Sequence, residues 1–161
     1  MAASSNKKVE VVRFDRATIE GFVQIPEGLT GGHVELLTPD GNLTRVPFPE
    51  TKVVCFVREF SGGQSWTPNR AFLTRPKTMG LWVRMRFRDG DWMEATIPNN
   101  LAMLDPAGFS ASPPDVSAQL QRVFVPREAL DTLEVLGVIG AAARRRPPKP
   151  ADKDKQISMF E

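Results

Sequence analysis

The sequence predicts an all-β protein of two tandem five-stranded small β-barrels with a disordered C-terminal tail. Three observations lead to this fold class. Two segments of the chain resemble each other, apolar and polar residues alternate with the two-residue period of strands, and turn signals such as Asp89-Gly90 recur at short intervals. A chain of 161 residues is long enough for two small domains that each bury a core.

The internal repeat relates residues 7–22 to residues 81–96. In each segment an Arg-Phe pair ends an extended run, a short polar turn follows, and a glutamate then precedes a small residue. A second match lies further along, where RVPFP resembles RVFVP. We infer a duplication, with Arg13-Phe14 matched to Arg86-Phe87, Glu20-Gly21 to Glu94-Ala95, and Arg45 to Pro49 matched to Arg122 to Pro126.

The first copy is predicted to contain five strands. The doublet Val11-Val12 breaks the strict alternation of the first strand and predicts a β-bulge there. The turn sequence at residues 39–42, Pro-Asp-Gly-Asn, separates the third strand from the fourth. The five strands are expected near residues 8–14, 18–25, 33–38, 43–48 and 52–58.

The second copy repeats this pattern. Four apolar residues, from Leu81 to Phe87, alternate with Trp82 and three arginines, which indicates a strand with one buried face. Asp89-Gly90 then predicts a hairpin, because glycine accepts the positive φ that such turns require. The five strands are expected near residues 81–88, 91–97, 101–105, 121–125 and 132–136.

These elements divide the chain into a disordered N-terminus, a first barrel, a linker, a second barrel and a basic tail. The linker is rich in Gly, Ser, Thr and Pro, yet Trp66, Phe72 and Leu73 in it are expected to pack across the two barrels. A second long loop is expected from Asp105 to Gln119, inside the second copy. The segments are residues 1–7, 8–58, 59–80, 81–137 and 138–161.

The order of these strands resembles the Sm-like fold of small β-barrels, and SH3-like barrels share the architecture. That fold has a hairpin with a glycine-kinked second strand, and its last two strands are separated by a single helical turn. The resemblance covers residues 8–58 and 81–137. It is carried by Val9, Val11, Phe14, Glu20, Gly21, Val46, Pro49, Val53 and Phe56 in the first copy, and by Val83, Met85, Phe87, Glu94, Val123, Pro126, Leu133 and Leu136 in the second.

RNA binding does not carry over with this resemblance. Sm-like proteins that bind RNA have an Asp or Asn loop after the third strand and an Arg/Lys-Gly loop after the fourth. The corresponding connections here, PFPETK and VPREALD, lack that glycine, and the Asp40-Gly41-Asn42 loop of the first copy has no counterpart in the second.

Composition argues against a metal site, a cofactor and enzyme chemistry. Cysteine and histidine each occur once, at Cys55 and His33, so no His/Cys zinc cluster can form. Cys55 lies in an apolar run and is expected to be a small core residue. The sequence contains no phosphate-cradling or nucleophile motif. The absence of a signal peptide and of a membrane-length apolar run predicts a cytoplasmic protein.

One strand face is a candidate nucleic-acid site. Trp82 together with Arg84, Arg86 and Arg88 could stack a base and bind phosphate, and the arginines at 144–146 could add charge. The alternative is a solvated face whose arginines pair with Asp89, Asp91 and Glu94. The candidate residues are Trp82, Arg84, Arg86, Arg88, Arg144, Arg145 and Arg146.

The C-terminal segment predicts a protein partner. Residues 141–155 combine Pro, Lys and Arg with almost nothing that could pack, which is typical of a disordered tether. The residues that follow resemble the short peptide with which bacterial DNA polymerases and repair factors bind the sliding clamp. That resemblance implies that Met159 and Phe160 fill an apolar pocket and that Gln156 contacts its polar lip. The docking residues are Gln156, Ile157, Ser158, Met159 and Phe160.

Overall fold

The computed structural model describes residues 5–61, 70–100, 106–114 and 120–140, and these residues form an all-β protein. Short 3-10 turns lie at Glu27–Leu29 (η1), Phe48–Glu50 (η2) and Arg127–Ala129 (η4). Among the described residues no helix is long and apolar enough to cross a membrane. The strands are β1 Ser5–Arg13, β2 Thr18–Ile25, β3 His33–Leu37, β4 Leu43–Pro47, β5 Thr51–Val57, β6 Gly80–Phe87, β7 Trp92–Ile97, β8 Gly108–Ala111, β9 Leu120–Pro126 and β10 Leu130–Ile139.

Nine of these strands lie where the sequence predicts a strand. The exception is the third strand of the second copy. The structure places it at Gly108–Ala111, inside the predicted 105–119 loop, while residues 101–105 lie outside the described residues. The segment PAGFSASPPD was expected to be a loop because it is rich in Pro and Ser, but Phe109 and Ala111 are buried in the core. β1 begins at Ser5, so residues 5–7 belong to the sheet and not to a disordered N-terminus.

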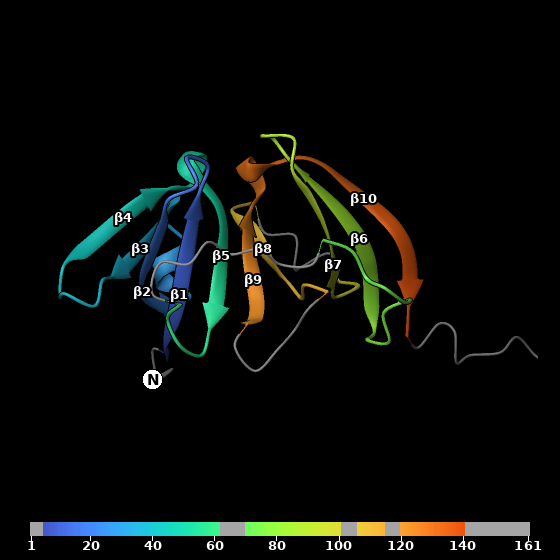
Figure 1. The fold of residues 1–161 in the computed structure, drawn as a ribbon, viewed down its shortest axis with the longest axis horizontal. Helices are drawn as coiled ribbons and strands as arrows, with labels where there is room; N and C mark the ends of the chain where they lie inside the picture. The colour runs from blue at the N-terminus through green and yellow to red at the C-terminus, as the bar shows by residue number, and fades with distance from the viewer. Residues whose placement is uncertain (1–4, 62–69, 101–105, 115–119, 141–161) are drawn as a thin grey trace, which may run out of the picture.

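The strands form two open sheets, and neither closes into a barrel. The seven-stranded sheet has the order β4-β3-β2-β1-β5-β9-β8, and the three-stranded sheet has the order β10-β6-β7. β4 and β10 lie at opposite ends of the molecule, with β5 and β9 in the middle (Figure 1). β7 and β8 are linked by an isolated bridge between Thr96 and Ser112, which joins the two sheets.

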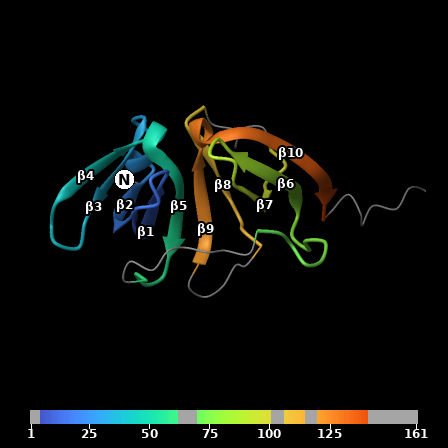
Figure 2. The ribbon, with the colours of Figure 1, turned by 45° about the horizontal axis from the view of Figure 1, so that its top comes forward.

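The two matching segments of the sequence, residues 8–58 and 81–137, are called the first and the second repeat from here on. Strands of these two repeats pair directly. β5, the last strand of the first repeat, is antiparallel to β9, the fourth strand of the second, with Val54 opposite Phe124 and Cys55 opposite Val123. The two strands lie side by side in both ribbon views (Figures 1 and 2). The two repeats therefore share a continuous sheet.

The structure shifts the predicted match between the repeats by one residue at the hairpin turns. In the first turn the backbone N–H of Arg13 donates to the carbonyl oxygen of Ala17 at 2.9 Å. In the second turn the backbone N–H of Phe87 donates to the carbonyl oxygen of Asp91 at 2.7 Å. Phe87 therefore corresponds to Arg13, and not to Phe14 as the sequence match proposes. The two Arg-Phe pairs therefore match in sequence but do not occupy equivalent positions in the structure. Phe87 is buried in the core, while Phe14 is half-buried at the turn.

The match around the fourth strand shifts as well. Pro47 and Pro126 each directly precede a 3-10 turn, with φ and ψ of −60° and 143° in the first repeat and −61° and 138° in the second. Pro126 thus corresponds to Pro47, and not to Pro49. The strand after each turn then carries the same irregularity. Lys52 is skipped in the pairing of β5 with β1, just as Asp131 is skipped in the pairing of β10 with β6.

Each core contains side chains from the other repeat. Val53, Cys55 and Val57 of β5 are buried in the core of the second repeat, with Met85 and Val123 among their neighbours in that cluster. In return, Phe124 of β9 is buried in the core of the first repeat and its ring lies 6.0 Å from that of Phe48. Both faces of β5 are therefore covered, which explains its nearly continuous apolar sequence.

The linker residues expected to pack between the barrels behave differently from one another. Phe72 is half-buried, and its ring lies 6.4 Å from that of Trp82 in an edge-to-face contact. Leu73 is 99% exposed, so the prediction that it packs across the barrels is wrong. Trp66 lies outside the described residues.

Candidate functional site

The predicted row of Trp82 and three arginines lies on β6 and the turn after it. Arg84, Arg86 and Arg88 are exposed, and Trp82 is half-buried. The residues between them, Val83, Met85 and Phe87, are buried, so the predicted alternation is confirmed. The row thus lies on the outer face of the second repeat.

Glu94 on the neighbouring strand β7 occupies the centre of this face. Its carboxylate is buried and accepts hydrogen bonds from the backbone N–H of Phe72 (3.2 Å), the indole Nε1–H of Trp82 (2.9 Å) and Nη2 of Arg84 (3.3 Å). A carboxylate with three donors can remain buried, because hydrogen bonds replace its lost hydration. Glu94 therefore binds Trp82 and Arg84 within the protein, as the solvated-face alternative expected for Arg84.

The arginines of the row differ in their surroundings. The guanidinium of Arg84 lies 5.2 Å from the ring centre of Trp92, and that of Arg88 lies 4.2 Å from the ring centre of Phe14 in the first repeat. Arg86 is exposed at a shallow groove of about 450 Å³, which is also lined by Arg84, Gly90, Trp92, Thr132 and Glu134. The row is thus not a uniform basic strip.

The remaining predicted site residues have no described position. Arg144, Arg145 and Arg146, and the docking peptide from Gln156 to Phe160, lie outside the described residues. The last described residue is Gly140, directly after β10 at one end of the molecule (Figure 1).

A larger groove lies between the hairpin turns of the two repeats. Its volume is about 770 Å³. Residues from β1, its turn and β5 form one side, and residues from the β6–β7 turn and β7 form the other. The lining side chains include four cations, two carboxylates and three aromatic rings: Arg13, Arg16, Lys52 and Arg70, then Asp89 and Asp91, then Phe14, Phe87 and Trp92.

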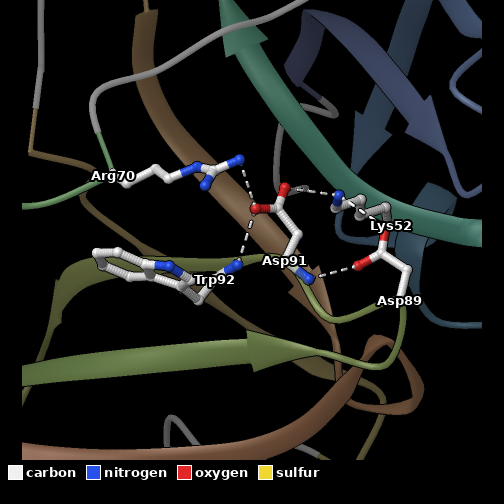
Figure 3. Close-up of polar contacts among 5 residues, drawn as sticks. All are labelled: Lys52, Arg70, Asp89, Asp91 and Trp92. Atoms are coloured by element: carbon white, nitrogen blue, oxygen red, sulfur yellow. Dashed lines mark hydrogen bonds and ion pairs between the residues drawn. The ribbon is translucent and has the colours of Figure 1, made fainter.

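An ion-pair network crosses this groove (Figure 3). Nζ of Lys52, in the first repeat, lies 2.9 Å from the carboxylates of both Asp89 and Asp91, in the second. Nη2 of Arg70 lies 2.9 Å from the other oxygen of Asp91, and the same oxygen accepts a hydrogen bond from the backbone N–H of Trp92. Lys52 reaches these carboxylates from the skipped position of β5, where the bulge changes the direction of its side chain.

The network keeps both carboxyl groups ionised. Partial burial raises the pKa of Asp91, but hydrogen bonds from Lys52 and Trp92 and the charges of Lys52 and Arg70 outweigh it and hold the pKa below its usual value. The pKa of Asp89 is likewise lowered, because the bonds from Lys52 and from the backbone N–H of Asp91 outweigh desolvation. Near neutral pH both groups are therefore carboxylates bound to a cation.

The first-repeat side of the groove carries two arginines in unusual settings. Arg16 has a φ of +71°, whereas glycine, Gly90, occupies the corresponding place in the second repeat with a φ of +90°. Arg13 binds Glu50 at 2.6 Å and lies 3.6 Å from Asp15. Its Nε atom is buried and has no hydrogen-bond partner among the described residues.

The described lining of the two grooves contains Asp, Glu, Lys and Arg side chains but no His, Cys or Ser. Cys55 is fully buried in the core, as the sequence predicts, and burial raises the pKa of its thiol, an effect to which the nearby carboxylate of Glu10 adds. Among the described residues no three His, Cys, Asp or Glu side chains are placed to hold a metal ion. The arrangement is suited to noncovalent binding by charge, hydrogen bonds and ring stacking.

Sequence reasoning missed two members of the network, Lys52 and Arg70. Lys52 is the one charged residue in the largely apolar run of residues 51–57. A lone cation in such a run could have indicated that this side chain pairs with carboxylates. Arg70 offered no comparable signal in a polar linker. Asp89 and Asp91 were expected to pair with the arginine row, but the structure pairs them with Lys52 and Arg70.

Comparison with known proteins places the chain in a family but does not assign it an activity. No curated protein and no solved structure matches the chain. One family model, described as a family of unknown function (DUF6982), matches residues 5–137. This match spans both repeats and every described strand as far as most of β10. The chain therefore belongs to the DUF6982 family.

Proposed function

We propose that the chain is a non-enzymatic adaptor, whose two repeats bind a partner while its C-terminal segment docks on the DNA sliding clamp. In this proposal each repeat is a five-stranded unit of the Sm-like or SH3-like kind. The strand order supports it. Within the first repeat the order is β4-β3-β2-β1-β5, and the second repeat follows the corresponding order β9-β8-β7-β6-β10 when the Thr96–Ser112 bridge is included.

The ionisation of Asp89 and Asp91 and the burial of Cys55 support a binding role rather than catalysis. Asp89 and Asp91 are held as carboxylates by Lys52, so neither is a good proton donor near neutral pH. Cys55 is buried and its pKa is raised, which disfavours the reactive thiolate. These groups stabilise the contact between the repeats, and we propose that the chain works without a cofactor or metal in the cytoplasm.

The observation that carries the docking proposal is the C-terminal sequence Gln156 to Phe160. Met159 and Phe160 are two large apolar residues at the end of a segment with six basic and three acidic residues between positions 141 and 161. Burial of each of these side chains in a partner's pocket would contribute about 1.5–3 kcal/mol. A segment that orders on binding loses entropy, so we expect an affinity in the micromolar range.

The test is a titration of the full-length chain, and of a labelled peptide of residues 150–161, against a purified bacterial sliding clamp. We expect saturable binding that is lost when Met159→Ala and Phe160→Ala are combined. Ser158→Ala is the matched control and should retain binding, because the motif accepts any small residue there. Absence of binding up to about a hundred micromolar would refute the docking proposal.

Nucleic-acid binding through the arginine row is the second candidate. It is favoured by the exposed guanidinium of Arg86 at a groove that also presents Trp92. It is weakened by the bonds of Trp82 and Arg84 to Glu94. Binding of single-stranded RNA or DNA by the full chain should then fall steeply with salt and weaken in Arg86→Gln. Binding that is flat with salt, or unchanged in that variant, would exclude this site.

A further inference from the structure

Two strands in the described part of the chain have a neighbour on one side only. The order of the sheets leaves β4, beside β3, and β10, beside β6, at their ends. The other two terminal strands, β7 and β8, are joined through Thr96 and Ser112, whose backbone N–H and carbonyl groups exchange two hydrogen bonds of 2.9 Å. Among the described residues, β4 and the part of β10 before Val138 therefore have no strand on their outer side, at opposite ends of the molecule (Figure 1).

These two edges are the counterparts of the two strands that join the repeats. At the internal junction the last strand of the first repeat, β5, pairs with the fourth strand of the second, β9. β4 is the fourth strand of the first repeat, and β10 is the last strand of the second. We propose that β10 of one copy of the chain pairs with β4 of a second copy, in the way that β5 pairs with β9.

The internal junction also gives the register of this contact. Pro47 corresponds to Pro126 and Thr51 to Leu130, which fixes the equivalence of the strands before and after each 3-10 turn. The internal pairs are Val54 with Phe124, Cys55 with Val123, and Phe56 with Arg122. Transferred to the open edges, they become Leu133 with Arg45, Glu134 with Thr44, and Val135 with Leu43.

Exposed apolar side chains lie at these same positions. Leu43 is 62% exposed, Val135 is 54% exposed and Leu133 is 38% exposed. Leu37, which pairs with Leu43 inside the sheet, is 46% exposed. The proposed register places Leu43 directly opposite Val135, so it covers the two most exposed of these edge residues with each other. A partner of unrelated sequence would not be expected to match both edges at once.

The contact is expected to be weaker than the internal junction. Thr132 and Glu134 take the places of Val53 and Cys55, which are fully buried between the repeats. Arg75 also donates a hydrogen bond of 2.8 Å to the carbonyl oxygen of Val138, so the far end of β10 is already covered. The pairing is therefore limited to the stretch around Leu133 to Val135, and it is a reversible association.

The geometry is head-to-tail. Each copy offers one β4 edge and one β10 edge, and the two surfaces differ, so the contact is heterologous. A heterologous contact extends into a chain of molecules or closes into a ring. In either case association does not stop at a symmetric dimer.

Cysteine pairs in the full-length chain test the register. Leu43→Cys in one population and Val135→Cys in another should form a disulfide-linked dimer under mild oxidation, since residues opposite each other in a sheet approach closely enough. The double variant should give a ladder of larger species. Cys55 does not interfere because it is fully buried.

The control pair is Leu73→Cys with Val135→Cys, since Leu73 is 99% exposed and belongs to neither β4 nor β10. It reports random collision, and we expect the Leu43 pair to cross-link about tenfold faster because the strands hold the thiols together. Equal rates for the two pairs would overturn the proposal.

A noncovalent measurement completes the test. Sedimentation velocity of the wild-type chain should show an average mass that rises with concentration. Val135→Lys should weaken this association about tenfold or more by placing a charge opposite Leu43, whereas Val138→Lys, at the covered end of β10, should change it little. A wild-type chain that stays monomeric at millimolar concentration, or association that persists in Val135→Lys, would overturn the proposal.

Discussion

Lys52 of the first repeat and Asp91 of the second form an ion pair of 2.9 Å across the groove between the hairpin turns. The ammonium group also lies 5.2 Å from the ring centre of Phe87 and 2.9 Å from Asp89. The side chain of Lys52 is 15% exposed, so this pair is better shielded from water than the surface pairs of the chain. Lys52, at the β5 bulge, thus links the last strand of the first repeat to the β6–β7 turn of the second.

Replacing Lys52 with Met should lower the free energy of unfolding by about 1–2 kcal/mol. Met keeps the aliphatic stem, but the two carboxylates lose their common partner, and their own partial exposure limits the cost. Urea denaturation followed by circular dichroism measures the change. Arg70→Met is the matched control and should cost no more than about 0.5 kcal/mol, because Arg70 is mostly exposed. Equal losses in the two variants would contradict the central role of Lys52.

The same network predicts loss of stability in acid. The pKa values of Asp89 and Asp91 are lowered in the folded state, so their contribution is present above the unfolded-state pKa of about 3.9 and is lost as pH falls through the folded-state values. The urea midpoint of the wild type should therefore fall as pH decreases below about 5. In Lys52→Met the fall should be shallower. Asp40, whose pKa is lowered mainly by the hydrogen bond from Thr38, contributes equally to both proteins and cancels.

Gly21 on β2 should not tolerate a methyl group. A Cβ at this position would lie 2.6 Å from Cδ1 of Leu36 and 2.9 Å from the carbonyl oxygen of Leu37. Gly21→Ala is expected to cost about 1–3 kcal/mol in urea denaturation, as overpacking of a core does. Gly137→Ala on β10 is the control, because its Cβ would meet nothing closer than 3.9 Å. A neutral Gly21→Ala would show that β3 can move away from β2.

The sequence predicts local features of this fold better than contacts between the repeats. Strand β6 was predicted because buried and exposed faces alternate within it, a pattern that each strand sets by itself. Gly21 was matched to the glycine that kinks the second strand of the Sm-like fold, and the structure shows that a side chain at this position would collide with Leu36. The pairing of Lys52 with Asp91 joins residues 39 positions apart, and it depends on how β5 crosses to the second repeat, which periodicity does not encode.

The predictions for strand β8 and for Leu73 were wrong because local sequence does not determine contacts with distant neighbours. Gly108–Ala111 lies between prolines and serines, yet it becomes a strand because β9 offers it backbone partners. Leu73 was expected to be buried because it is apolar, but single apolar residues on a surface are common. In both cases the outcome was decided by neighbours that are distant in sequence.

The two hairpin turns should respond in opposite ways to glycine exchange. Arg16 and Gly90 hold corresponding places with φ of +71° and +90°. Arg16→Gly should raise the free energy of unfolding by between zero and about 1 kcal/mol. Glycine relieves the strain of the left-handed backbone, and this gain offsets the greater freedom of glycine in the unfolded chain. Gly90→Ala should destabilise by about 1 kcal/mol. Thermal unfolding of both variants measures these shifts, and a clear loss in Arg16→Gly would show that the Arg16 side chain contributes more than its strain costs.

The exchange of core side chains predicts that the two repeats unfold together. Phe124 belongs to the second repeat but is buried in the core of the first, so Phe124→Ala should cost about 3–5 kcal/mol and should destabilise both repeats. In a Trp66→Phe background, tryptophan fluorescence reports on the second repeat through Trp82 and Trp92, and circular dichroism reports on all strands. The two probes should give coincident urea transitions in this background with and without Phe124→Ala. Leu73→Ala, at a fully exposed position, should leave the midpoint unchanged. Separate transitions for the two probes would mean that β5 and β9 join two independent units, because a shared core cannot lose one half and keep the other.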